Sequence, residues 1–154
     1  MRAERSAWMT SWVVIDASLL LATYLNELHS QSARNFLAQC IQNNITVAAP
    51  ALLHYEIVAA LRKQVYRGNI SSDEGIVGCN ALFSYPIKFF IDHDLLRRSY
   101  TLAAQFNRPN TYDMQYVAVA ERLACDFWTA DERLYSTLHD HLIWVKWIGT
   151  QTDA

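Results

Sequence analysis

Four acidic residues, Asp16, Glu56, Asp113 and Asp131, border separate apolar segments that are spread along the chain. Asp16 directly ends one short apolar run, and Asp131 comes two residues after the end of another. Glu56 falls in the second turn of an apolar helical pattern, and Asp113 opens a further one. Side chains just beyond the strands of a parallel sheet meet at the same edge. The sequence therefore predicts that these four carboxylates converge.

A cluster of carboxylates can support only a few kinds of chemistry. Like charges a few ångströms apart repel one another and take up protons unless a cation neutralises them. Ligands that are all oxygen select a hard cation, Mg²⁺ or Mn²⁺, over zinc. Such an ion can activate water and stabilise the charge that develops when a phosphodiester is cleaved. The four acids thus predict a divalent-metal site suited to phosphodiester hydrolysis.

Each acid also has a purely structural interpretation when it is taken alone. Asp113 and Asp131 stand where a helix begins, so either could be an N-cap. A buried, unpaired Asp16 at a strand end is harder to explain as a structural residue. The joint placement of all four favours the functional interpretation.

The segments that would position these acids alternate between short β-type runs and longer helical patterns. Apolar runs predict strands at 12–15, 45–48, 87–91, 127–129 and 142–145. Helical spacing predicts helices at 18–26, 32–43, 50–67, 71–83, 92–106, 113–124 and 131–138. Strands that are apolar on both faces and joined by helices predict an α/β fold, with a short, mostly parallel sheet flanked by helices.

Several helix ends carry a local signal. Pro50 is expected in the first turn of the helix after the second strand, and Gly68 is expected to end that helix. Ser71 precedes two acids and predicts the N-cap of the next helix. Asp92 or Asp94 is expected to cap the helix after the third strand.

The composition excludes several classes of protein. A chain of 154 residues that is 52% hydrophobic predicts one folded domain rather than a disordered chain. A net charge of −2 excludes a strongly basic domain that binds nucleic acid by bulk electrostatics. Ten of the 13 cations are arginine, which favours forked contacts to phosphate or carboxylate. The sequence has no CxxC pair, GxSxG motif or glycine-rich phosphate loop.

The N-terminal region loosely resembles a secretory signal, because Arg2 and Arg5 precede the apolar stretch 12–25. Asp16 lies within that stretch, and a carboxylate there is expensive in a membrane. No run approaches the roughly 20 apolar residues of a membrane span. We therefore expect a cytoplasmic protein that does not enter a membrane, with residues 1–11 as an N-terminal extension.

Other charged residues are weaker candidates. Arg108, in the loop before Asp113, and Arg62, after Glu56 on the same predicted helix, could hold phosphates that the carboxylates repel. Each could equally belong to a solvated helix face. The segments 92–94 and 139–141 alternate Asp and His and could bind metal, but helix capping and a polar turn explain them better.

Four motifs in order resemble the PIN domain, and within it the VapC-type toxin ribonucleases of bacterial and archaeal toxin–antitoxin pairs. The resemblance covers about 12–147 of a single domain spanning 1–154, and its motifs are Val14–Ser18, Pro50–Glu56, Tyr112–Asp113 with the apolar residues behind it, and Trp128–Leu134.

The resemblance implies a three-layer sandwich and Mg²⁺-dependent cleavage of RNA. It also implies inhibition by a cognate antitoxin, and a homodimer. By position, Asp16, Glu56, Asp113 and Asp131 would be the acidic catalytic and metal-binding quartet. Ser18 and Thr129 match small hydroxyl positions that would hold the ligating carboxylates in place.

Two functional hypotheses follow. The first is a metal-dependent endoribonuclease, the toxin of a type II toxin–antitoxin pair, in which the four acids hold water activated by Mg²⁺ or Mn²⁺. The second is a catalytically silent PIN-like module that binds RNA or regulates it.

A response-regulator receiver fits less well, because it needs paired acids after the first strand and Asp16 is alone. A haloacid-type phosphohydrolase needs Asp-x-Asp there, and the sequence has Asp16-Ala17-Ser18.

Overall fold

A computed structural model describes residues 11–151. The predicted N-terminal extension is 1–11, and residues 1–10 of it lie outside the described residues. Within them, no helix is long and apolar enough to cross a membrane.

The core of the fold is one sheet of five parallel strands in the order β3-β2-β1-β4-β5. Its strands are β1 (Trp12–Ile15), β2 (Thr46–Pro50), β3 (Ile87–Phe90), β4 (Asp126–Thr129) and β5 (Val145–Trp147). The central strands β1 and β2 are buried along most of their length, because helices cover both faces of the sheet. The predicted α/β class is therefore confirmed, and the described sheet is wholly parallel.

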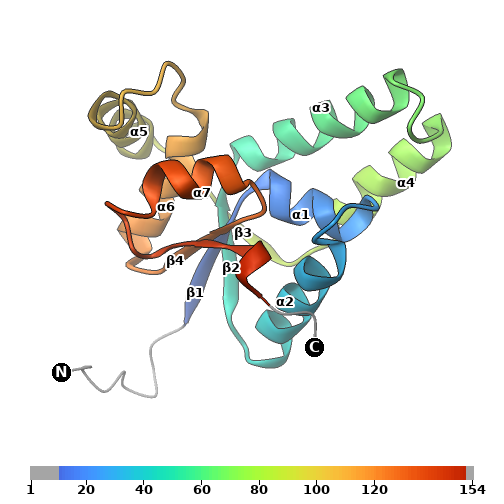
Figure 1. The fold of residues 1–154 in the computed structure, drawn as a ribbon, viewed down its shortest axis with the longest axis horizontal. Helices are drawn as coiled ribbons and strands as arrows, with labels where there is room; N and C mark the ends of the chain where they lie inside the picture. The colour runs from blue at the N-terminus through green and yellow to red at the C-terminus, as the bar shows by residue number, and fades with distance from the viewer. Residues whose placement is uncertain (1–10, 152–154) are drawn as a thin grey trace.

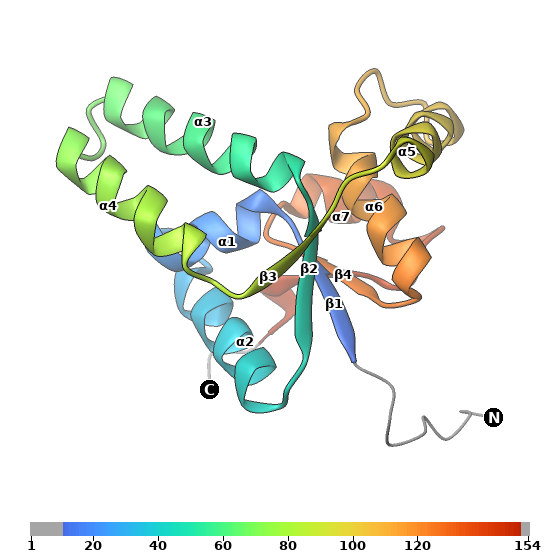
Figure 2. The same ribbon diagram turned by 180° about the vertical axis from the view of Figure 1, so that it is seen from behind.

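Seven α-helices connect the described strands: α1 (Ala17–Tyr24), α2 (Ser30–Gln42), α3 (Leu52–Tyr66), α4 (Ser72–Phe83), α5 (His93–Gln105), α6 (Tyr112–Leu123) and α7 (Glu132–Leu138). A short 3-10 helix, Ile148–Thr150, follows β5. Helices α1 to α4 lie on one side of the sheet, and α5 to α7 lie on the other (Figures 1 and 2). Helices α3 and α4 run side by side and extend away from the sheet as an arm (Figure 1).

This topology creates a switch point between β1 and β4. The chain leaves β1 toward one side of the sheet and leaves β4 toward the other, although the two strands are neighbours. A crevice opens beyond the carboxyl ends of strands at such a point. The ends of β1 and β4 are Ile15 and Thr129.

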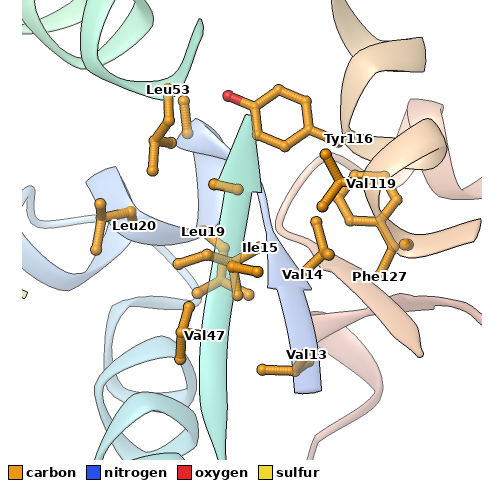
Figure 3. Close-up of a cluster of buried hydrophobic side chains, with 14 of the residues drawn as sticks. Val13, Val14, Ile15, Leu19, Leu20, Val47, Leu53, Tyr116, Val119 and Phe127 are labelled. Atoms are coloured by element: carbon orange, nitrogen blue, oxygen red, sulfur yellow. The ribbon is translucent and has the colours of Figure 1, made fainter. Parts of the chain in front are cut away.

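Apolar side chains from both layers fix these two strands. Val14, Ile15 and Phe127 are fully buried, and Leu19 and Val119 pack around them from α1 and α6 (Figure 3). Close packing of this kind holds the strand ends rigidly. The edge at which β1 and β4 end therefore stands on a closely packed part of the core.

The helix-end signals agree with the structure except at Pro50. Ser71 and Glu74 form a capping box at α4, Asp92 caps α5, and Gly68, with a φ of +75°, follows the end of α3. Pro50 is the last residue of β2 rather than part of α3. The pairing of β2 with β1 ends at Ala48, so Pro50 has no partner in β1. The N–H group that proline lacks therefore costs the sheet no hydrogen bond to β1.

The last strand is also displaced from its predicted position. Residues 142–145 were expected to form it, and β5 is instead Val145–Trp147. Leu142 donates its N–H to the Leu138 carbonyl and accepts from the Val145 N–H, so it belongs to a turn. Ile143 is 73% exposed. An apolar run predicted a strand here, but the chain uses it to turn after α7.

Candidate active site

The four predicted acids all stand beyond the carboxyl ends of strands. Asp16 follows β1 and caps α1, and Asp131 follows β4 and caps α7. Glu56 lies in the second turn of α3, after β2, and Asp113 lies in the first turn of α6. Four separate segments therefore bring carboxylates to one edge of the sheet.

Asp16 is the most buried of the four, with 6% of its surface exposed. One carboxylate oxygen accepts hydrogen bonds from the Ser18 hydroxyl at 2.6 Å and the Leu19 N–H at 3.0 Å. The other oxygen accepts from the Thr129 hydroxyl. Three donors thus fix the orientation of a carboxylate that has almost no access to water.

Ser18 and Thr129 also connect Asp16 to the turn after β4. Their hydroxyl oxygens lie 3.2 Å apart. The Ser18 oxygen accepts from the Ala130 N–H at 3.0 Å, and the Thr129 oxygen accepts from the Asp131 N–H at the same distance. The two hydroxyls therefore join the ends of β1 and β4, and they hold Asp131 in a fixed relation to Asp16.

Asp131 itself binds the start of α7. One of its carboxylate oxygens accepts from the N–H groups of Arg133 at 2.9 Å and Leu134 at 3.2 Å. The capping interpretation of Asp131 is therefore correct, and both capping bonds are made by the same oxygen, Oδ1. Asp113 does not cap α6, whose N-cap is Thr111.

Asp113 faces a cation from the preceding loop. Arg108 donates to its carboxylate at 3.4 Å, and both side chains are partly exposed. Burial raises the pKa of Asp113, the charge of Arg108 opposes the rise, and the neighbouring charge of Asp131 adds to it. Arg108 is therefore already directed into the acidic cluster, at the position from which it could meet a phosphate.

Glu56 has a partner that the sequence analysis missed. The hydroxyl of Tyr116 donates to Glu56 Oε1 at 2.6 Å, across 60 residues of chain. Burial raises the pKa of Glu56, the Tyr116 hydrogen bond opposes the rise, and the charge of Asp113 adds to it. Tyr116 lies one helical turn after Asp113, and that spacing is the signal that could have identified it.

The charges of the four acids act on one another. Burial raises the pKa of Asp16 from 3.8 to about 6, against the hydrogen bonds that favour its ionised form, and the charge of Asp113 raises it further. Asp113 therefore interacts with all three of the other acids. A cation placed among them would relieve both the repulsion and the loss of hydration.

The donor set suits a hard divalent ion, because it offers carboxylate oxygens with hydroxyl groups behind them. In the described residues, no three His, Cys, Asp or Glu side chains are already close enough to ligate one ion together. Hydrogen bonds within the protein hold Asp16, Glu56 and Asp131, and an ion pair holds Asp113. Ligation by the whole set therefore requires side-chain rotation at the more exposed acids.

Of the weaker candidates, Arg108 contacts the acidic cluster and the others have different surroundings. Arg62 lines a groove of about 400 Å³ between α3 and α4. In the segment 92–94, Asp92 caps α5 and pairs with Arg122, and Asp94 pairs with Arg97. In the segment 139–141, His139 stacks on Tyr135, and His141 lies tilted against Phe106. Capping, ion pairing and packing thus account for both segments.

A comparison with protein families decides the relationship. The sequence model of the PIN domain matches residues 14–141, which include all four acids. The chain belongs to the PIN domain family. The predicted resemblance to that family is therefore confirmed.

Curated relatives of this PIN domain are VapC ribonucleases. Ribonuclease VapC12 of Mycobacterium tuberculosis is 34% identical over 96 residues, which cover 62% of this chain and 71% of the relative. Ribonuclease VapC9 of the same species is 30% identical over 130 residues, covering 81% and 90%. Ribonuclease VapC3 of Pyrobaculum aerophilum is 28% identical over 125 residues, covering 79% and 91%.

Solved structures share the fold of this PIN domain. PAE2754 from Pyrobaculum aerophilum superimposes with a TM-score of 0.66 at 20% identity and covers 92% of this chain and 94% of its own. VapC20 of Mycobacterium tuberculosis, described as a sarcin-ricin loop cleaving toxin, superimposes with a TM-score of 0.59 at 10% identity, covering 82% and 95%. These likenesses confirm the three-layer PIN architecture.

Proposed function

We propose that this PIN domain is a metal-dependent endoribonuclease and the toxin of a type II toxin–antitoxin pair. The observation that carries the proposal is the convergence of Asp16, Glu56, Asp113 and Asp131 at the β1/β4 switch point, where Asp113 raises the pKa of two of its neighbours. The VapC ribonucleases among its relatives support RNA as the substrate.

The four carboxylates would hold Mg²⁺ or Mn²⁺. When bound, such an ion activates water and stabilises the charge that develops on the phosphate. Asp16 is the fixed member of the set, because Ser18 and Thr129 orient both of its oxygens. Asp113 is partly exposed and its ion pair with Arg108 is long, so it can turn toward an incoming ion, and Glu56 is partly exposed with one oxygen bonded to Tyr116.

Arg108 would contact the substrate. Its guanidinium pairs with Asp113, and both groups are open to solvent. Asp113 is one of the residues that would hold the metal, and with that carboxylate engaged Arg108 would be free to bind a phosphate oxygen, which its forked geometry suits. Arg62 is a second candidate for RNA contact, at the α3/α4 groove. Arg62 lies six residues after Glu56 on α3, so it would contact a nucleotide farther along the RNA.

The partners and location follow from the same proposal. An unrestrained ribonuclease would damage the cell that makes it, so we infer a cognate antitoxin protein and a cytoplasmic site of action. A homodimer is inferred from the family resemblance. Co-expression with the product of a neighbouring short gene is expected to yield a complex and to relieve growth arrest. The toxin role is wrong if neither occurs.

Cleavage of a structured RNA by the wild type and by Asp16→Asn tests the enzyme. The wild type is expected to cut with Mg²⁺ and to stop with chelator, and Asp16→Asn is expected to lose most of its activity because Asn lacks the charge that retains the ion. Asp73→Asn, on the exposed first turn of α4, is the matched control and should cut normally.

Two outcomes would overturn the proposal. Equal cutting by wild type and Asp16→Asn would exclude Asp16 as a catalytic group. Binding of RNA by both proteins without cleavage of any RNA in a broad panel would instead favour a catalytically silent binding module.

A further inference from the structure

The hydroxyl of Tyr116 forms the contact between α6 and α3 at the candidate active site. Tyr116 is 1% exposed, and its hydroxyl donates to Glu56 Oε1 at 2.6 Å. Figure 3 shows the hydroxyl pointing from α6 toward the helix that carries Leu53. The same turns of α6 therefore carry Asp113 and the group that holds Glu56.

Packing fixes the direction of this hydroxyl. The Tyr116 ring stacks on the ring of Phe127 in β4, with centroids 5.9 Å apart and planes 11° from parallel. Phe127 is itself fully buried in the sheet. A ring held in this way cannot follow a carboxylate that moves, so the Glu56 side chain adapts to the hydroxyl rather than the reverse.

The apolar surroundings would accept phenylalanine at this position just as well. A buried hydroxyl costs free energy unless it is hydrogen-bonded, and here Glu56 supplies the acceptor. Glu56 has no other hydrogen-bond donor among the residues that the structure describes. The bond occupies Oε1 and leaves Oε2 without a protein donor there.

We propose that Tyr116 is a positioning residue, which holds Glu56 by one oxygen so that the other oxygen faces the divalent cation. This inference rests on the proposed metal-dependent function and extends it to a residue outside the acidic quartet. Mutation of a residue that hydrogen-bonds to a metal ligand typically lowers metal affinity or activity by about 10–100-fold. Glutamate has a longer and more flexible side chain than aspartate, so it needs such an anchor most.

Tyr116→Phe tests the proposal, because it removes one oxygen and keeps the ring and its stack. Binding of Mn²⁺ is measured by calorimetry, and the Mg²⁺ concentration for half-maximal RNA cleavage is measured separately. Both are expected to weaken by about 10–100-fold. Tyr24→Phe is the matched control, because the Tyr24 hydroxyl also makes a 2.6 Å bond, to the Glu74 carbonyl oxygen on α4. It should change neither value.

A double-mutant cycle shows whether Tyr116 acts through Glu56. In the background of Glu56→Gln, adding Tyr116→Phe is expected to weaken Mn²⁺ binding no further, since the two residues act as one unit. Full additivity would overturn the proposal. So would a Tyr116→Phe protein that binds Mn²⁺ and cleaves like the wild type, or one that does not fold, because the hydroxyl would then serve the fold.

These results separate the inference from the proposed function. A wild-type protein that binds no Mn²⁺ and cuts no RNA would refute both. A wild type that does both, while Tyr116→Phe matches it, refutes only the role of Tyr116.

Discussion

Asp16 carries a negative charge that its surroundings disfavour and its proposed chemistry requires. The side chain is buried at the end of β1, and the charge of Asp113 is close enough to raise its pKa further. Three hydrogen-bond donors keep its oxygens in place despite this. Such a residue lowers the stability of the fold, and its carboxylate is fixed in place as one ligand for a cation.

The pKa of Asp16 sets the sign of a stability prediction. Burial raises this pKa from 3.8 to about 6, so the folded protein holds the proton more tightly than the unfolded chain does. Protonated Asp16 therefore stabilises the folded protein fully below about pH 4. This contribution to the free energy of unfolding is lost as the pH rises through about 6. In chelator, Asp16→Asn is expected to raise the free energy of unfolding above pH 6 by up to about 3 kcal/mol, with little gain near pH 4.

Urea denaturation of both proteins at the two pH values measures this difference. Asp73→Asn is the matched control, because it makes the same chemical change at an exposed side chain at the start of α4. A gain from Asp16→Asn that is equal at both pH values would mean that the ionised carboxylate is not the source of the instability.

The residue scale also shows what sequence patterns can identify. Asp16, Ser18, Thr129 and Asp131 stand at or just beyond predicted strand ends, so parallel topology alone brings them together. Tyr116 stands at no strand end, and its position one helical turn after Asp113 also fits the apolar spacing of α6. Its hydrogen-bond partner is 60 residues away in the chain, and only the fold brings the two side chains together.

Among the elements, the ends of β1 and β4 determine the shape of the site. The loops after these strands diverge to opposite sides of the sheet, and Ser18 and Thr129 connect them. The positions of β1 and β4 were predictable, because short β-branched or aromatic runs ended directly before polar residues. The displacement of β5 was not, because turn hydrogen bonds at Leu142 overrode the apolar pattern of residues 142–145.

Thr129→Val tests the connection between β1 and β4. Valine keeps the shape and β-propensity of threonine but removes the hydroxyl that donates to Asp16 and accepts from the Asp131 N–H. The buried Asp16 carboxylate loses a donor, which costs about 1–3 kcal/mol, and the part-buried Asp131 N–H loses its acceptor. We expect a lower melting temperature and a smaller rise in that temperature when Mn²⁺ is added.

Thr46→Val in β2 is the control for this variant, since it makes the same chemical change in another strand of the sheet. It should leave the response to Mn²⁺ unchanged. The connection would be unimportant for metal binding if Thr129→Val and Thr46→Val responded to Mn²⁺ alike.

At the scale of the whole molecule, a slightly acidic chain must bind a polyanion. The net charge of −2 gives no general attraction for RNA, and the acidic cluster repels phosphate until a cation fills it. Local cations must therefore supply the contacts. Arg108 is the one that the described structure directs at the cluster, through its pair with Asp113.

The salt dependence of RNA binding tests this arrangement in the Asp16→Asn background, where cleavage should be blocked. Each lost phosphate contact lowers the slope of log K against log salt by about 0.7 for a single strand. Arg108→Ala is expected to weaken binding and to reduce the slope by about that amount. Lys88→Ala is the control, because it removes a cation that is not beside the acids. The Lys88 amino group lies 5.8 Å from the ring centroid of Trp12, at the start of β1, whereas Asp16 follows the end of that strand. Equal effects of the two variants would show that RNA is held by diffuse charge rather than by Arg108.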